Sequence, residues 1–161
     1  MSWKDTYKVW QERTDLEPDL KQELAAMSDD KEIEDAFYGP LSFGTAGMRG
    51  LMGPGINRMN VYTVRQATEG LATLMDSLGD DIKKRGVAIG YDSRHNSRKF
   101  AHDAARVLGA HGIKVYIYDN LRPTPELSFA VRHMGTYAGI MITASHNPKE
   151  YNGYKIYGED G

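Results

Sequence analysis

The chain has 161 residues, of which 40% are hydrophobic, and this length and composition fit one domain with a single packed core. Its 20 basic and 22 acidic residues give a net charge of -2, so no positive field favours nucleic acid or an anionic membrane as a partner. Cysteine is absent, which excludes disulfides and thiolate metal sites. The first residues lack the apolar stretch of a signal peptide, and no window nears the roughly 20 apolar residues of a membrane span. These features favour a soluble, cytoplasmic protein.

Residues 1–38 are predicted to form a helical extension. Three aromatic residues share one face of its first helix, at the i, i+4, i+7 spacing: Trp3, Tyr7 and Trp10. Pro18 suits the first turn of a second helix that runs towards Met27, and Ser28 suits the cap of a third that ends near Phe37. We expect these helices to pack on a core domain formed by residues 39–161.

A glycine-rich segment begins near Leu41 and contains Arg49 and Arg58. Its glycines are regularly spaced: Gly44, Gly47, Gly50, Gly53 and Gly55. This spacing predicts a loop whose backbone needs conformational freedom. Asn60 then suits the cap of a long helix with one apolar stripe between Val61 and Leu78.

Strands and helices alternate from residue 87 onward. The predicted strands are residues 87–91, 114–118 and 137–143, and the helices between them are residues 97–110 and the segment around 127–134. This β-α-β-α-β order predicts an α/β fold, a three-layer α/β/α domain with a mixed, mainly parallel sheet. Residues 152–157 follow the third strand so soon that we expect them to return antiparallel beside it.

Ligands bind such sheets beyond the carboxyl ends of the parallel strands. Three segments with unusual chemistry are predicted to meet there: residues 44–50, residues 92–94 and residues 145–147. The last segment contains Ser145, which follows an apolar strand and precedes Asn147-Pro148, a pair that favours a turn. We therefore expect Ser145 to lie on a turn at the ligand-binding edge.

Ser145 needs assistance to act as a nucleophile. The Gly-x-Ser-x-Gly pattern of α/β-hydrolases is absent around it, which disfavours an esterase. His146 can act on Ser145 only if the turn redirects its side chain, and it can equally bind phosphate or orient the loop. Lys155, in the returning strand, can supply a phosphate contact or a proton acceptor, provided that burial or a nearby cation such as Arg49 lowers its pKa.

Three motifs, in order, give the sequence a resemblance to a known family. They are Phe43 to Gly50 (FGTAGMRG), Gly90 to Arg94 (GYDSR), and Thr143 to Pro148 (TASHNP) followed by Tyr151 to Lys155 (YNGYK). Together they resemble the first domain of the phosphoglucomutase/phosphomannomutase family over residues 38–161, and the helical extension resembles the branch of long phosphoglucomutases that includes phosphopentomutase-like members. One short pattern is weak, whereas three in the same order are specific.

The resemblance implies a sugar-phosphate isomerase in which Ser145 carries a phosphoryl group. That group would pass to a hydroxyl of a sugar monophosphate, the bisphosphate would reorient, and the other phosphate would return to Ser145. Family motifs place Lys155 and His146 in the catalytic pocket and Arg49 beside the transferred group, with Thr45 and Asn147 among the phosphate-binding residues. The implied cofactors are Mg²⁺, bound to Ser145 through its phosphate, and a sugar 1,6-bisphosphate as activator.

The sequence departs from the family pattern in one respect. The family completes its Mg²⁺ site with a loop of closely spaced aspartates, and no such string is present in these 161 residues. We therefore expect the chain to be part of a longer protein, to depend on further domains of the same polypeptide and to be inactive alone. The preferred sugar, whether glucose, mannose or a pentose, stays open.

An alternative function is a noncatalytic phosphate-binding or interaction module, which the missing aspartate loop favours. Separately, an isolated domain exposes apolar surface, so we expect the chain to self-associate. Asp92 and Arg94 are expected to pair and organise their loop, Asn147 can order its own backbone instead of binding substrate, and no site is assigned to the histidines without metal-ligand spacing: His95, His102, His111 and His133.

Overall fold

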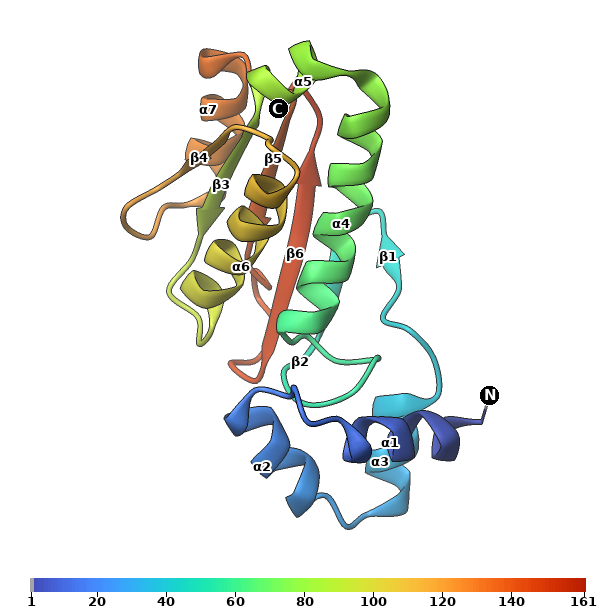
Figure 1. Ribbon diagram of the computed structural model, residues 1–161. Coiled ribbons are helices and arrows are strands. Elements are labelled where there is room, and N and C mark those ends of the chain that lie inside the picture. Colours follow the sequence, from blue (N-terminus) through green and yellow to red (C-terminus); the bar gives the residue numbers. More distant parts are fainter. Residues whose placement is uncertain (1) are drawn as a thin grey trace.

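A computed structural model describes residues 2–161, which form a six-stranded sheet with helices on both faces and a helical cluster at one end (Figure 1). The strands are β1 (Phe43–Gly44), β2 (Gly47–Leu51), β3 (Val87–Tyr91), β4 (Val115–Ile117), β5 (Ala138–Ile142) and β6 (Tyr151–Tyr157). The helices are α1 (Trp3–Glu12), α2 (Pro18–Ala26), α3 (Asp30–Phe37), α4 (Val61–Leu78), α5 (Asp80–Arg85), α6 (Ser97–Ala110) and α7 (Thr124–Met134).

The sheet has the order β1-β2-β6-β5-β3-β4. β3 pairs in parallel with β4 and with β5, and helices α6 and α7 make the crossovers, which confirms the predicted β-α-β-α-β unit. β6 runs antiparallel to β5, as expected, and β2 runs antiparallel to β6. β2 therefore has the same direction as the parallel strands, so the sheet is mixed and most of its strands share one direction.

Two hydrophobic clusters fill the space on the two faces of the sheet. α4 and α6, which lie side by side in Figure 1, pack on one face through residues that include Val64, Phe100 and Ile140. α7 packs on the other face, where Leu127 and Val131 contact residues such as Met141. β3 and β5 are buried along their whole length, as expected of central strands covered on both sides. The three-layer α/β/α prediction is confirmed.

The glycine-rich segment contains a β-hairpin that the loop prediction missed. Phe43 pairs with Met48 and Gly44 with Gly47, and β2 continues through Arg49 to join the sheet. Gly47 has a φ of +86°, and a Cβ there would lie 2.4 Å from the carbonyl oxygen of Tyr154. The close approach of two strands therefore requires a glycine at this position, and the prediction of a loop was wrong for residues 47–51, which form a strand.

Asn60 caps α4 as predicted. Its side chain accepts hydrogen bonds from the N–H groups of Tyr62 and Thr63, and it donates to the carbonyl oxygens of Gly53 and Gly55, each at 2.9 Å. The buried cap thus fixes the loop between β2 and α4 as well as the helix. α5 was not predicted, because its six residues are too few to show an amphipathic period.

The extension forms a small core of its own. The helices α1, α2 and α3 bury Trp10, Leu24 and Phe37 together, and Trp3 and Tyr7 pack on this cluster as the aromatic stripe predicted. Asp29, not Ser28, caps α3, because the Asp29 side chain accepts from the N–H of Lys31. Whether residues 1–38 and 39–161 are separate domains stays a prediction. No helix in the described range 2–161 combines the length and the apolar character needed to cross a bilayer.

Candidate functional site

The site is built at the edge where the parallel strands end. The N–H of Thr143, just after β5, donates to the carbonyl oxygen of Gly153 at 3.1 Å, and Gly153 pairs with Arg49 on β2. These three residues therefore form one row across three neighbouring strands. On β3, the N–H of Asp92 donates to the carbonyl oxygen of Ile142 at 3.1 Å, which brings the fourth strand to the same edge. The segments predicted to meet here do so.

Ser145 lies on a turn directly beyond β5. Its φ is +55°, a left-handed conformation that is unfavourable for a residue with a Cβ atom. Its N–H donates to the hydroxyl oxygen of Thr143 at 3.0 Å, and the N–H of Asn147 donates to the carbonyl oxygen of Ala144 at 3.1 Å. The residue is exposed, so its hydroxyl is accessible from outside the chain. The predicted turn is confirmed.

The side chain of Arg94 binds the main chain of this turn. One terminal nitrogen, Nη2, donates to the carbonyl oxygens of Ser145 at 2.8 Å and Asn147 at 2.6 Å. The other, Nη1, donates to the carbonyl oxygens of Pro148 at 2.8 Å and Tyr151 at 3.1 Å. The guanidinium group therefore gathers four carbonyl groups of the segment from residue 145 to residue 151. These contacts go beyond the pairing with Asp92 that was predicted for Arg94.

A buried network holds Arg94 in turn. The Asp92 carboxylate lies 3.5 Å from Arg94 Nε, and it accepts hydrogen bonds from the Ser97 hydroxyl at 2.6 Å and from the Arg94 N–H at 3.0 Å. The fully buried Asn152 donates through Nδ2 to the Ser97 hydroxyl at 2.9 Å and to the carbonyl oxygen of His95 at 3.0 Å. The expected pairing of Asp92 with Arg94 is confirmed, and it connects the start of α6 to β6.

Arg49 reaches the same turn from β2. Its Nη1 atom donates to Oδ1 of Asn147 at 3.4 Å, a long contact. Its Nε atom is buried, and within residues 2–161 no acceptor lies in hydrogen-bond range of it. Gly153 makes room for this side chain, since a Cβ there would lie 3.1 Å from Arg49 Cγ and 2.5 Å from the carbonyl oxygen of Thr143. A buried donor without an acceptor costs about 1–3 kcal/mol.

Lys155 lies on β6 opposite Met141, two residues beyond Gly153 on the same face of the strand. Burial lowers the pKa of its ammonium group, and the positive charge of Arg49 lowers it further. Burial and Arg49 are the two causes that the sequence indicated for such a shift. Within the described range, no ion pair of Lys155 is found that would oppose the shift.

The remaining predicted site residues are less closely connected. His146 is exposed next to Ser145, and Thr45 is exposed in the turn between β1 and β2. Within residues 2–161, neither side chain makes a hydrogen bond to Ser145, Arg49 or Lys155. The structure thus brings Ser145, Asn147 and Arg49 together and leaves the parts of His146 and Thr45 as predictions.

A concave surface surrounds the turn. Its lining residues are Asp92, Ser93, Arg94, His95, Ser145, Asn147 and Lys149.

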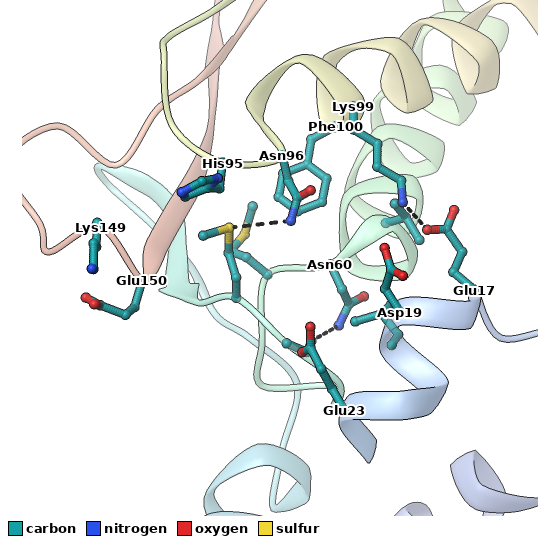
Figure 2. Close-up of a pocket in the computed structure, with 15 residues that line it drawn as sticks. Glu17, Asp19, Glu23, Asn60, His95, Asn96, Lys99, Phe100, Lys149 and Glu150 are labelled. Carbon is teal, nitrogen blue, oxygen red and sulfur yellow. Dashed lines mark hydrogen bonds and ion pairs between the residues drawn. The ribbon is translucent and has the colours of Figure 1, made fainter. Parts of the chain in front are cut away.

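A separate cavity of about 300 Å³ lies between α2 and the start of α6, with Glu17, Asp19 and Glu23 on one side and His95 and Lys149 on the other (Figure 2). There, burial and the nearby charge of Asp19 raise the pKa of Glu23. Ser145, Arg49 and Lys155 do not line this second cavity.

The chain by itself does not fit a complete Mg²⁺ site. Residues 2–161 contain no group of three or more histidine, cysteine, aspartate or glutamate side chains placed to hold a metal ion. At the predicted site, the carboxylate of Asp92 is already engaged by Ser97 and Arg94. Mg²⁺ prefers six oxygen ligands in octahedral geometry, and this part of the chain does not supply them.

The fold and the site define an α/β/α domain with a polar, cation-bearing concavity at the carboxyl edge of its parallel strands, where such folds bind ligands. Comparison with known proteins narrows this class. Residues 40–161 match the family model described as phosphoglucomutase/phosphomannomutase, alpha/beta/alpha domain I. The chain therefore belongs to the phosphoglucomutase/phosphomannomutase family, and it contains domain I of that family.

Curated relatives agree with this assignment. A phosphoglucomutase of Staphylococcus epidermidis is 47% identical over 146 residues, which cover 91% of this chain and 26% of the relative. A human phosphopentomutase is 40% identical over 156 residues, covering 93% of this chain and 26% of the relative. The chain thus spans about a quarter of the length of the curated relatives it matches.

Solved structures show the same fold. A protein of Thermus thermophilus, provisionally assigned as a phosphomannomutase, has a TM-score of 0.66 and 34% identity, covering 75% of this chain and 26% of that one. A family protein of Burkholderia thailandensis has a TM-score of 0.61 and 24% identity, covering 74% of this chain and 26% of that one, which supports the fold alone. The predicted fold class and family are both confirmed.

Proposed function

We propose that this chain acts as the phosphoserine domain of a phosphoglucomutase-type isomerase, with Ser145 as the residue that carries the phosphoryl group. The observation that carries the proposal is the exposed, backbone-clamped Ser145 turn, located inside the segment that matches the family's domain I. The names of the relatives support the reaction class. The remaining parts of the active site would come from domains outside these 161 residues.

In the proposed reaction, a sugar hydroxyl oxygen attacks the phosphorus atom on Ser145, the P–Oγ bond breaks, and the hydroxyl proton passes by way of Lys155 or His146 to the departing Oγ. After the bisphosphate reorients, Ser145 Oγ attacks its other phosphate, and the Oγ proton passes by the same route to the departing sugar oxygen. The lowered pKa of Lys155 favours it as the proton acceptor, because a neutral amine is needed for that role. Arg49 would stabilise charge on the transferred group, and its unpaired Nε would gain an acceptor there.

The cofactor assignments remain proposals of the same kind. A Mg²⁺ ion would be bound through a phosphate oxygen on Ser145, with its other ligands supplied from outside this chain. A sugar 1,6-bisphosphate would act as activator by phosphorylating Ser145. Thr45, His146 and Asn147 would contact phosphate, and within residues 2–161 Asn147 is the one of these three with a side-chain hydrogen bond to another site residue, Arg49.

The test is the phosphorylation of Ser145 in the full-length polypeptide. Intact-mass analysis before and after addition of glucose 1,6-bisphosphate is expected to show one added phosphoryl group in the parent protein. Ser145→Ala is expected to abolish the addition, and Ser77→Ala, an exposed serine on α4, is expected to leave it unchanged. An unmodified Ser145 during active turnover would contradict the proposal.

The preferred sugar and the activity of the 161-residue chain on its own need separate assays. Coupled assays with glucose 1-phosphate, mannose 1-phosphate and ribose 1-phosphate on the full-length polypeptide would rank the sugars, and the similarity to a human phosphopentomutase makes the pentose a necessary arm. The same assays on the 161-residue chain address the noncatalytic alternative, and full activity there would contradict the dependence on further domains. Self-association of the isolated chain stays a prediction, which light scattering at several concentrations can check.

A further inference from the structure

The side chain of Arg94 donates four hydrogen bonds to main-chain carbonyl oxygens of residues 145–151, in addition to its ion pair with Asp92. We propose that Arg94 is a positioning residue, which fixes the backbone of the turn so that Ser145 Oγ is placed for phosphoryl transfer. This inference rests on the proposed function, because it names a residue that acts through Ser145. It assigns to Arg94 no contact with substrate.

The contacts match the shape of a guanidinium group. A guanidinium has five N–H donors in a rigid planar fork, and here Nη1 and Nη2 each donate to two carbonyl oxygens while Nε faces Asp92. The four accepting carbonyls are distributed over residues 145–151. A lysine has three donors on one nitrogen and cannot satisfy two pairs of carbonyls at once. The geometry is therefore specific to arginine.

The turn needs such a support. Ser145 has a φ of +55°, so its backbone occupies a conformation that its Cβ atom makes unfavourable. Its side chain is exposed, whereas its carbonyl oxygen accepts a hydrogen bond from Arg94 at 2.8 Å. With the backbone fixed, the position of Oγ depends on the single torsion χ1, which has three staggered states. The hydrogen bonds from Arg94 thus leave rotation about χ1 as the one torsion that places Oγ for phosphoryl transfer.

The base of the clamp is rigid. The Arg94 side chain is 14% exposed, and Asp92 fixes it from behind through the ion pair at 3.5 Å. Asp92 in turn accepts from Ser97 at the first residue of α6, and Ser97 accepts from the buried Asn152. Loss of the fork would therefore release the turn without removing any residue of the hydrophobic core.

The test compares Arg94→Gln and Arg94→Lys with the matched control Arg98→Gln, an exposed arginine four residues along the chain. In the full-length polypeptide, we expect both Arg94 variants to lower kcat by about 100-fold, the effect of roughly 1 Å of misplacement at a reacting atom, with KM for the sugar phosphate little changed. Arg98→Gln is expected to behave as the parent. Because lysine keeps the charge, parental kcat in Arg94→Lys would overturn the inference and leave only an electrostatic role.

A backbone readout distinguishes positioning from a loss of folding. Hydrogen exchange of the bonded amides of Ser145, Asn147 and Tyr151 is expected to accelerate in the Arg94 variants, while amides of β3 and β5 keep their protection. General loss of protection in both variants would overturn the inference, since Arg94 would then support the fold. Ser145→Ala separates the two proposals. If it leaves phosphoryl uptake unchanged, the proposed function fails, and if it abolishes uptake while Arg94→Gln keeps parental kcat, only the positioning role fails.

Discussion

Lys155 and Arg49 are held near each other by strand register alone. Arg49 pairs with Gly153, and Lys155 lies two residues further along β6 on the same face. The two cations are therefore diagonal neighbours, and their repulsion is the second cause of the lowered Lys155 pKa, after burial. A lysine whose pKa is lowered loses its proton at a lower pH than an exposed lysine does.

This register gives a prediction for titration. In the parent chain, Lys155 is expected to titrate below the ordinary range of a lysine, as followed by NMR of the side-chain methylene group next to Nζ. Arg49→Gln is expected to raise the Lys155 pKa only part of the way, because burial, the larger cause, remains. Arg98→Gln serves as control and is expected to cause no shift. A Lys155 pKa that is unaffected by Arg49→Gln would show that the two side chains do not interact.

The positions of Ser145 and Lys155 could be predicted, because the order of strands along the chain determines which strand ends lie close together. A serine after an apolar strand lies at the end of that strand, and a strand that returns ten residues later places Lys155 near the same edge. The four-carbonyl contact of Arg94 could not be predicted in this way. Its acceptors are main-chain oxygens, which every residue has, and their convergence appears only once the turn has formed.

At the scale of elements, His111 joins α6 to α4. It follows the end of α6, and its ring nitrogens lie 2.5 Å from the Asp76 carboxylate and 3.0 Å from that of Glu69, both on α4. Lys83 on α5 pairs with Asp76 at 2.9 Å. The hydrogen bonds to Asp76 and then to Glu69 raise the pKa of His111 above its ordinary value of 6.5.

The sign of the resulting pH dependence follows from linkage. Because the pKa of His111 is higher in the folded chain than in the unfolded chain, its stabilisation is fully present below pH 6.5 and is lost as pH rises through the folded pKa. His111→Asn is therefore expected to lower Tm more at about pH 5.5 than at about pH 9, because the stabilisation is lost in the direction of rising pH. His133→Asn, on the exposed part of α7, is the control. An equal loss of Tm at both pH values would contradict the linkage.

Elements differ in how far local sequence determines them. α4 could be predicted from its apolar stripe and the Asn60 cap, because both signals lie within the helix. The β1–β2 hairpin could not, since its glycines resemble a loop and the reason for Gly47 is the Tyr154 carbonyl oxygen on another strand. A partner distant in sequence therefore explains why this hairpin was missed.

On the scale of the whole molecule, Tyr62 is among the residues that connect the extension with the α/β core. Tyr62 on α4 packs edge-on against Trp10 at a centroid distance of 5.6 Å. Its hydroxyl donates to the carbonyl oxygen of Asp15 at 3.1 Å and accepts from the N–H of Glu17 at 2.9 Å. Glu17 adds ion pairs to Arg65 on α4 and to Lys99 on α6. These contacts predict that the extension and the core unfold together.

The two tryptophans, Trp3 and Trp10, are both in α1, so tryptophan fluorescence reports on the extension, whereas far-UV circular dichroism is dominated by helices of the core. In the parent chain, we expect the two thermal transitions to coincide, as they do for a cooperative unit.

Tyr62→Ala removes two hydrogen bonds and an aromatic contact that together are worth about 2–4 kcal/mol. The fluorescence midpoint is then expected to fall roughly 5–10 °C below the circular dichroism midpoint. Tyr38→Ala, at an exposed position, is expected to keep the transitions together. Separate transitions already in the parent chain would mean that the extension is an independent unit, and coincident transitions in Tyr62→Ala would mean that the remaining contacts, such as the Glu17 and Asp35 ion pairs, suffice to join it to the core.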